Sequence, residues 1–444
     1  MKHLTLQELG KIIRKVRKER GLRLEDLADE NISPATVSNI ERGIAHVSPE
    51  KIAYLLKKLS LSEHQLTEIS IQEQKDLHQL ELTFLMISTL CELGYEDEAL
   101  TKLNEIQLKE NHPFIAKIYY YKGYCLFNKK KWKQAERALL QALRYTKLNK
   151  QVLSKSNLEA ACYLHLGCSQ YKQRKYEQAL TYLNYGLKAY DGNRNHQYLK
   201  NQLYLNKIEC LKKLQRITEG NQLLQEIWSS IQHSPDIQTT IHFYVLRSEF
   251  AQKAGLYDEA IYYATDGIKL ASRNQQLSQL LNLWTILGNL YMMCGQWSLS
   301  ESCFQMVIRK KNQLASNTKR ASAYLQLGIL YMKQKQYQRA YKLLQSAINY
   351  SDSSQYSKEF SLALLVMGDL CIKLGKTDEA LYYFEKGQKM TEKHNDPTRE
   401  LPFWLRLAQY WEGKDHAKFQ NCIENIYRLQ KKRFISINEY DKFL

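Results

Sequence analysis

Proline is scarce in this chain of 444 residues, which contains only six. The six stand where helices should begin or between repeated units: Pro34, Pro49, Pro113, Pro235, Pro397 and Pro402. A proline inside a helix removes a backbone hydrogen bond, so helices tolerate proline only in their first turn. The small number of prolines and their positions therefore predict an almost entirely helical protein.

Long hydrophobic runs are also missing. Residues 1–20 lack the apolar stretch of a signal peptide, and no segment reaches about 18 uninterrupted apolar residues. We therefore expect neither secretion nor membrane insertion, and a cytoplasmic location.

The nine cysteines include no CxxC pair, which argues against a metal site or a redox motif. Metal ligation and disulfides remain the alternatives, but reduced, packed cysteines are the better interpretation. The positions that should be packed within the repeats are Cys91, Cys125, Cys210, Cys294 and Cys371.

Catalytic motifs are absent as well: there is no P-loop, no GxSxG and no HExxH. The eleven histidines are scattered, and we expect His165 and His242, on repeat helices, to be packed or solvated. The sequence thus predicts no enzyme, no cofactor and no metal.

A repeated unit occupies most of the chain after residue 80. The stretch 323–347 reads as two short amphipathic helices, with Gly328 and Ala340 small where the helices should meet and Tyr337 beside the turn. From Tyr176 onward, positions equivalent to Tyr337 recur with a step of 41 once and then 40 every time, and two further equivalents precede them. They are Glu96, Trp132, Tyr176, Ile217, Tyr257, Trp297, Tyr337, Thr377 and Ala417.

Small residues keep the same phase. Eight of the nine units have Ala, Gly or Ser three residues after this marker, and only Gln420 departs from the rule. Five units also have glycine nine residues before it: Gly123, Gly167, Gly288, Gly328 and Gly368. Because one such hairpin cannot bury its apolar face alone, the units must stack into a solenoid.

The unit from Trp284 to Phe304 resembles the tetratricopeptide repeat, with Gly288, Tyr291 and Gly295 at the signature positions. The usual period is about 34 residues, so we expect the extra length to lie in the helices, and HEAT-like repeats of about 40 to 47 remain an alternative. The expected fold is all-α, with a right-handed superhelical solenoid of about nine hairpins.

The first 65 residues differ in kind. An apolar helix face over residues 5–20 ends at Gly21, and a short second helix is expected over 24–29. Ser33 and Pro34 then form a helix start signal, and Ser48 with Pro49 repeats it. A fifth helix, capped by Ser62, completes the predicted five-helix domain.

That order, with GLRLEDLA followed by SPATVSNIERG, resembles the helix-turn-helix domain of phage repressors and Cro. The resemblance implies that Ala35, Thr36 and Asn39 face base edges in the major groove. It assigns phosphate contacts to four further residues: Arg23, Ser33, Ser38 and Arg42. Leu24 departs from the family, which usually has a backbone-contacting Gln there. A helical bundle without a DNA role is the alternative.

The resemblance also implies a structural ion pair between Arg17 and Glu41. Of the net charge of +18, only about +3 comes from the first 65 residues, so charge alone does not locate a DNA site.

The expected domain boundaries are 1–66 for the helix-turn-helix domain, 67–80 for a helical linker and 81–444 for the repeats. The linker contains no Gly or Pro, which favours a stiff helical join.

The combination of such a head with such a solenoid resembles the peptide-sensing regulators of Gram-positive bacteria and their mobile elements, the RRNPP group that includes PlcR, PrgX, NprR, the Rgg proteins and AimR. It implies a homodimer that binds double-stranded operator DNA and is controlled by a short signalling peptide, as in quorum sensing. The alternative is an adaptor that inhibits a protein such as a response regulator, as the headless Rap proteins do.

In tetratricopeptide units the residue after the seam glycine position points into the concave groove. Along the chain that position carries Tyr124, Cys168, Glu209, Glu249, Asn289, Ile329, Asp369 and Gln409, so the middle of the solenoid is expected to present a polar, mostly acidic series. With Asn206 and Asn282 nearby, we expect the amides to clamp peptide backbone and the carboxylates to bind positive charge on the peptide. The alternative is that these positions are simply wet.

Overall fold

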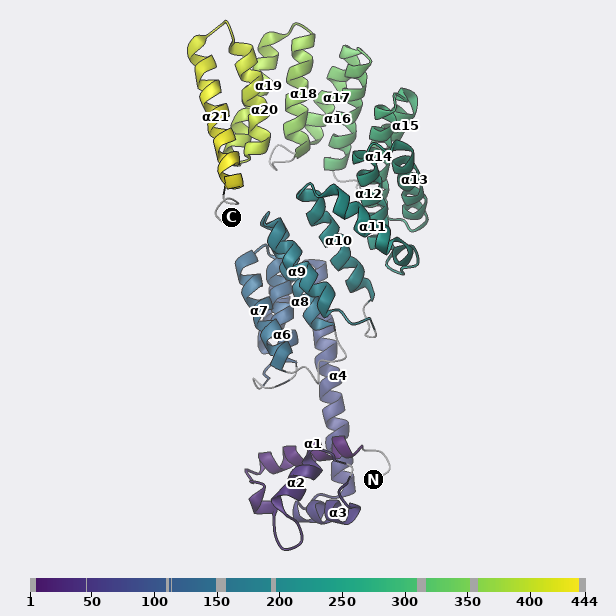
Figure 1. Ribbon diagram of the computed structural model, residues 1–444, viewed down its shortest axis with the longest axis vertical. Helices are drawn as coiled ribbons and strands as arrows, with labels where there is room; N and C mark the ends of the chain where they lie inside the picture. Colours follow the sequence, from purple (N-terminus) through teal and green to yellow (C-terminus); the bar gives the residue numbers. More distant parts are fainter. Residues whose placement is uncertain are drawn as a thin grey trace. The chain divides into compact units, whose positions relative to one another are not determined.

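The computed structural model describes residues 5–44, 46–108, 112, 114–148, 157–192, 197–309, 317–351 and 358–438. Within them the fold is all-α, with no strand (Figure 1). The chain divides into two compact units, residues 1–173 and 174–444, which are taken in turn. None of the described helices is long and apolar enough to cross a bilayer.

The N-terminal head contains α1 (Leu6–Glu19), the 3-10 turn η1 (Glu25–Leu27), α2 (Pro34–Glu41) and α3 (Pro49–Lys58). Capping residues fix where α1 and α2 begin. Thr5 and Glu8 form a capping box on α1, and the Ser33 hydroxyl accepts a hydrogen bond from the Thr36 amide at the start of α2. The predicted second helix over 24–29 is shorter than expected, because only the turn η1 forms there.

The head has its own apolar core. Ile13, Val37 and Leu55 are fully buried at its centre, one from each of α1, α2 and α3, and Leu66 of the next helix joins them. Gly10 lets α1 cross the end of α2 closely, because a Cβ there would lie 2.4 Å from the Ile40 carbonyl oxygen.

Helix α4 (Glu63–Leu93) runs without interruption for 31 residues from the head into the first repeat. Its capping box is formed by Ser62 and Gln65, and Gly94 ends it in the left-handed conformation. Both predicted linker boundaries, after residues 66 and 80, therefore fall inside one helix.

The repeats follow as consecutive helix pairs. In the first unit, α4 pairs with α5 (Glu96–Glu105), α6 (Ile115–Asn128) with α7 (Trp132–Leu148), and α8 (Leu158–Lys172) closes the unit. In the second unit, after α9 (Tyr176–Ala189), the pairs are α10 (Gln197–Lys213) and α11 (Ile217–Gln232), α12 (Ile237–Lys253) and α13 (Tyr257–Arg273), α14 (Leu277–Met293) and α15 (Trp297–Ile308), α16 (Asn317–Lys333) and α17 (Tyr337–Tyr350), α18 (Lys358–Lys373) and α19 (Thr377–Lys393), and α20 (Pro397–Trp411) and α21 (His416–Asn438).

The marker residues coincide with helix starts. Eight of the nine second helices begin at the marker itself, and α21 begins one residue before Ala417. The extra length of the repeat lies in the helices, as expected, since α12, α13 and α14 each reach 17 residues.

The predicted seam between the two helices of a hairpin is confirmed. The Ser248 hydroxyl donates to the Ala260 carbonyl, and the Ser300 hydroxyl to the Gly288 carbonyl, both at 2.8 Å. A Cβ on Gly328 would lie 2.7 Å from the side chain of Leu344. Positions nine before and three after the marker therefore face each other.

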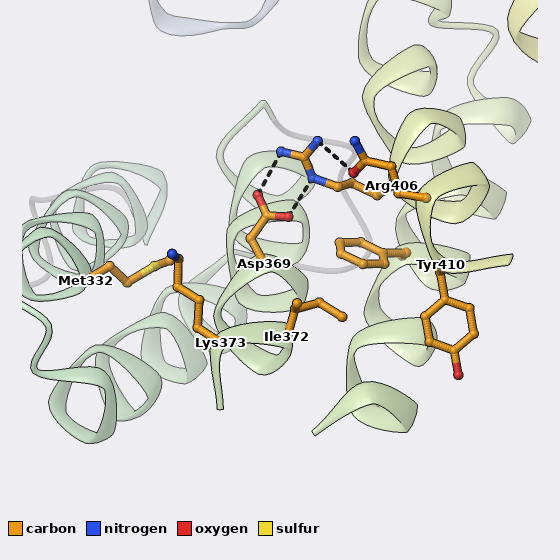
Figure 2. Close-up of a pocket in the computed structure, with 8 residues that line it drawn as sticks. Met332, Asp369, Ile372, Lys373, Arg406 and Tyr410 are labelled. Atoms are coloured by element: carbon orange, nitrogen blue, oxygen red, sulfur yellow. Dashed lines mark hydrogen bonds and ion pairs between the residues drawn. The ribbon is translucent and has the colours of Figure 1, made fainter. Parts of the chain in front are cut away.

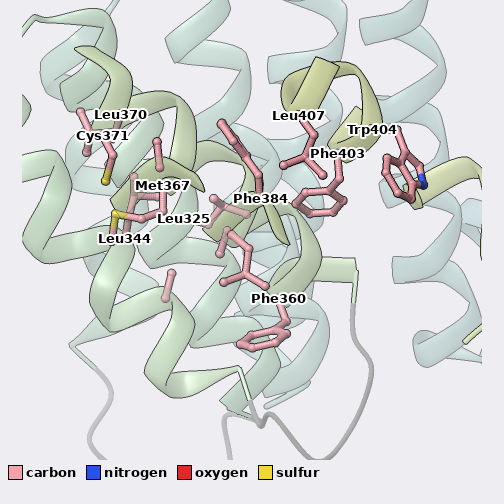
Figure 3. Close-up of a cluster of buried hydrophobic side chains, with 14 of the residues drawn as sticks. Leu325, Leu344, Phe360, Met367, Leu370, Cys371, Phe384, Phe403, Trp404 and Leu407 are labelled. Carbon is pink, nitrogen blue, oxygen red and sulfur yellow. The ribbon is translucent and has the colours of Figure 1, made fainter. Parts of the chain in front are cut away.

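Large side chains fill the space around these seams. Figure 3 shows part of the core that α16 to α21 share, where Phe384 and Phe403 are almost fully buried beside Leu344 and Met367. The cysteines Cys91, Cys125, Cys210 and Cys371 are buried, as expected, and none of the nine cysteines forms a disulfide. The expectation for Cys294 was wrong: it caps the C-terminus of α14 and is exposed.

Candidate DNA-contacting helix and repeat groove

Helix α2 is the predicted recognition helix, and its first turn faces solvent. Ser33 and Ala35 are exposed and Thr36 is half-buried, while Val37 and Ile40 point into the core. The Ser33 hydroxyl caps α2: it accepts a hydrogen bond from the Thr36 amide at 3.2 Å and lies 2.9 Å from the Thr36 hydroxyl. This surface leaves a helix N-terminus with small side chains free to approach DNA.

The predicted adenine-reading residue is already held by a neighbour. The Arg42 guanidinium donates to Asn39 Oδ1 over 2.6 Å, from an exposed position at the end of α2. The amide oxygen keeps a second lone pair and the Nδ2 group its two protons, so Asn39 retains what an adenine edge requires. The contact with Arg42 orients the Asn39 side chain.

The remaining predicted DNA contacts lie nearby in sequence. Ser38 is half-buried on α2. Arg23 is exposed, and its backbone amide donates to Asp26 Oδ2 at 2.7 Å, which anchors the turn before η1.

The predicted ion pair between Arg17 and Glu41 is confirmed. Arg17 Nε lies 2.5 Å from Glu41 Oε1, and Nη2 lies 3.0 Å from Oε2, so the contact is bidentate. A third bond joins Arg17 Nη1 to the Leu22 carbonyl at 2.7 Å. The hydrogen bond to Glu41 raises the pKa of Arg17. These contacts tie α1, the turn before η1 and α2 into one rigid frame.

In the second unit, two predicted groove carboxylates share one cation. Lys212 Nζ lies 3.0 Å from Glu209 Oε1 and 2.8 Å from Glu249 Oε2, which links α10 to α12. Burial lowers the pKa of Lys212, but the two carboxylates outweigh it and the net shift is upward. The cluster therefore carries one negative charge that is not balanced within it.

The predicted amides differ in how they are used. Asn206 Nδ2 donates to the Gln202 carbonyl of its own helix at 2.8 Å, and Asn282 is exposed. Asn289 is half-buried, and its Oδ1 atom is enclosed without a hydrogen-bond partner among the described residues. A buried acceptor of this kind favours a donor from outside.

Asp369 does not present a free carboxylate. Arg406 of the next repeat binds it through Nε and Nη2, at 2.6 and 3.2 Å, and also approaches Gln409 at 3.5 Å. Figure 2 shows this pair at one side of a pocket of about 520 Å³ that is lined by residues of α16, α18, α19 and α20. Met332, Ile372 and Tyr410 give the pocket apolar walls, and Lys373 adds an exposed cation.

Sequence reasoning missed Lys212 and Arg406, which form ion pairs with three of the predicted carboxylates. Each stands three residues from a groove position on its own helix, after Glu209 and before Gln409. Helical spacing places such a residue on the same face, so a second groove position in each repeat could have been examined for cations.

Comparison with known proteins agrees with this architecture. A helix-turn-helix family model matches residues 13–66, and a tetratricopeptide-repeat model matches residues 319–393. No curated protein matches the sequence. The chain thus contains a helix-turn-helix domain and, over residues 319–393, tetratricopeptide repeats.

Solved structures share the fold of this helix-turn-helix repeat protein at low sequence identity. A Rap protein complexed with competence and sporulation factor is 11% identical, with 80% of this chain and 98% of that chain covered and a TM-score of 0.51. The apo form of RapI is 12% identical, with 63% and 99% covered and a TM-score of 0.50. NprR in complex with its peptide NprX is 14% identical, with 82% and 98% covered and a TM-score of 0.49. At these identities the likeness concerns the fold alone.

Proposed function

We propose that this protein is a sequence-specific, DNA-binding transcriptional regulator that acts in the cytoplasm as a homodimer. A short signalling peptide bound among the repeats would control its affinity for DNA. The observation that carries the proposal is the α2 surface: a solvent-facing helix start with Asn39 oriented by Arg42, on a frame locked by the Arg17 to Glu41 pair. Such rigid support is what a base-reading side chain needs.

The homodimer follows from the size of the head. One short recognition helix reads a few base pairs, and high specificity in this kind of domain comes from two half-sites about one helical turn apart. Two heads are therefore needed on one operator.

The peptide is proposed from the groove residues. The Glu209, Lys212 and Glu249 cluster has one carboxylate charge to spare, which suits a basic side chain or amino terminus of a peptide. Asn289 offers an enclosed acceptor for a backbone amide. The pocket beside Asp369 and Arg406 suits an apolar side chain, since its walls are Met332, Ile372 and Tyr410.

The DNA-binding step can be tested with operator fragments selected from random sequence. Asn39→Ala should weaken binding by about 1 to 3 kcal/mol at particular base pairs, whereas Arg42→Ala should weaken all sequences and reduce the salt dependence. Because Arg42 also orients Asn39, we expect Arg42→Ala to relax specificity at the same base pairs to a smaller extent. If both variants lost affinity equally for selected and for random DNA, the assignment of α2 as the helix that contacts bases would be wrong.

The peptide step requires the cognate peptide, for which small exported pro-peptides encoded beside this gene are the first candidates. Calorimetric titration should show weaker binding to Asn289→Ala and Glu249→Gln, with Gln225→Ala, at an exposed position of α11 on the other helix of a hairpin, as the control. Unchanged affinity in both variants would place the peptide elsewhere. A stoichiometric protein partner captured without any operator binding would favour the adaptor function instead.

A further inference from the structure

The positive charge of this chain is concentrated in the repeats of the first unit that follow α5. Residues 115–173 contain twelve Lys and Arg but only two acidic residues, so they supply +10 of the net charge of +18. The preceding residues 66–105 have the opposite balance, with nine Asp and Glu against two Lys. The two signs are therefore segregated, whereas an ordinary surface intersperses them.

One face of α7 gathers four of these cations. Successive residues of a helix are about 100° apart, so four exposed side chains fall within an arc of about 80° and span about 21 Å of helix. They are named here the α7 basic face: Lys133, Arg137, Arg144 and Lys147. The other α7 residue in this arc is Leu140, which is also exposed.

None of the four cations has an acidic partner among the described residues. Glu136, the single acid of α7, is half-buried outside the arc, and Asp97 of α5 pairs with Lys129 in the turn before α7. The second helix of another repeat differs, since in α13 Lys269 Nζ lies 3.0 Å from Asp266 Oδ1. The repeat fold therefore does not require a face of one sign. Four like charges within about 21 Å favour an anionic partner, because they repel one another without it.

We infer that the α7 basic face binds the phosphate backbone of DNA beside the stretch that the head contacts. The inference rests on the proposed function and adds a second contact that does not depend on base sequence. DNA fits the face because it is a linear array of phosphates, with one negative charge per about 1.7 Å of helix axis. The head that is proposed to hold DNA belongs to the same unit as α7.

Helix α4 indicates how far from the head this contact lies. Phe84 follows Leu66 of the head core by 18 residues, or about 27 Å of helix, and its ring stacks on Tyr121 of α6 at 5.4 Å. Tyr119 of α6 stacks on Tyr145 of α7, also at 5.4 Å, so the end of the α7 basic face lies near this level. About 27 Å corresponds to about 8 base pairs of DNA at 3.4 Å each. We therefore expect the contact outside the half-site that one head reads.

The test compares a short operator duplex with one extended by about 20 base pairs of random sequence on each side, since the expected contact lies about 8 base pairs away. Fluorescence anisotropy measures the affinity of the full chain for both duplexes at several salt concentrations. On the long duplex, Arg137→Gln/Arg144→Gln should bind roughly tenfold more weakly, and the slope of log affinity against log salt should fall by about 2, because each phosphate contact contributes about 0.9. On the short duplex this variant should bind as the wild-type protein does.

The matched control is Lys386→Gln/Lys389→Gln, which removes two exposed cations from α19, another second helix. It should leave binding to both duplexes unchanged. Circular dichroism should show the same helix content in all three proteins, because every substituted side chain is exposed.

The outcomes separate this inference from the proposed function. If Arg137→Gln/Arg144→Gln bound both duplexes as the wild-type protein does, or lost the same affinity for each, the inference would fail while the proposed function stood. Loss of binding to anionic lipid vesicles or to an acidic protein, with no change on DNA, would also overturn it. If the wild-type protein selected no operator but bound long random duplexes through Arg137 and Arg144, the proposed sequence-specific function would fail and the α7 contact would remain.

Discussion

Arg17 and Glu41 show how two side chains can set the angle between two helices, α1 and α2. Both are more than nine-tenths buried, and Arg17 also binds the Leu22 carbonyl, so three segments of the head meet at one guanidinium. A buried pair of this kind adds little net stability, because the desolvation of two charges offsets their attraction. Its main effect is on geometry.

We expect Arg17→Met alone to destabilise the head by about 3 to 5 kcal/mol, because it leaves the Glu41 carboxylate buried without a partner. The double variant Arg17→Met/Glu41→Leu should recover most of this loss, short of about 1 kcal/mol for the bond to Leu22. Hydrogen exchange of the α1 and α2 amides measures both. A double variant as unstable as the single one would show that the pair itself stabilises the head.

His165 illustrates a second residue-scale effect, in the first unit. Tyr120 OH lies 3.1 Å from its Nε2 atom, the rings of Tyr124 and Phe127 lie against it, and Nδ1 is enclosed without a partner among the described residues. Burial lowers the pKa of His165 to about 4. The folded protein thus holds this histidine neutral.

Because the folded pKa lies below the ordinary value of about 6.5, protonation favours the unfolded state. The stabilisation from keeping His165 neutral is complete above about pH 6.5 and is lost as the pH falls toward 4. By pH 5 the loss in the free energy of unfolding is about 2 kcal/mol. The unfolding temperatures measured at pH 7.5 and at pH 5 should therefore differ less for His165→Gln than for the wild-type protein. His46→Gln, at an exposed position of the head, should behave as wild type.

At the scale of the helical hairpin, the seam positions decide whether the repeat forms. Gly288 would normally weaken a helix relative to alanine by about 1 kcal/mol. Here its missing side chain admits Phe304, whose ring would lie 2.6 Å from an added Cβ. The packing of Phe304 against Gly288 therefore stabilises the hairpin by more than the low helix propensity of glycine destabilises it.

We expect Gly288→Ala to destabilise the second unit by about 1 to 3 kcal/mol, because the buried Phe304 ring has no room to move. Gly288→Ala/Phe304→Leu should recover part of the loss. Urea unfolding of the full chain, followed by tryptophan fluorescence, measures the change. A more stable Gly288→Ala would mean that propensity governs the seam.

The hairpins were predictable because their pattern is local: Gly328, Ala340 and Tyr337 fix helix starts and seams within one unit. The Arg17 to Glu41 pair was predictable only through resemblance. What could not be predicted was which side chain of one repeat meets which of the next, as Arg406 meets Asp369 across 37 residues. Those contacts depend on how successive hairpins stack, and a pattern read along one helix face does not contain that information.

At the scale of the molecule, α4 is the element that joins the head to the first repeat. It contributes Leu66 to the core of the head and Phe84 to the core of the first repeat. Between residues 72 and 79 it has no glycine or proline at which to bend. Because α4 has no point at which to bend, a rotation of the first repeat should turn the head by the same angle.

This stiffness predicts a phase effect on DNA binding. One alanine inserted between Asp76 and Leu77 turns the head by about 100° relative to the first repeat, and seven inserted residues turn it by only about 20° while adding about 10 Å. If two heads are held at a set angle through α4 and the repeats, the one-residue insertion should abolish tight operator binding, whereas the seven-residue insertion Ala-Glu-Ala-Ala-Lys-Ala-Ala should retain more of it. Fluorescence anisotropy with an operator duplex measures both, and an isolated half-site serves as the control, since it needs only one head. Equal operator affinity in the two insertion variants would show that the join bends freely and that α4 does not transmit orientation.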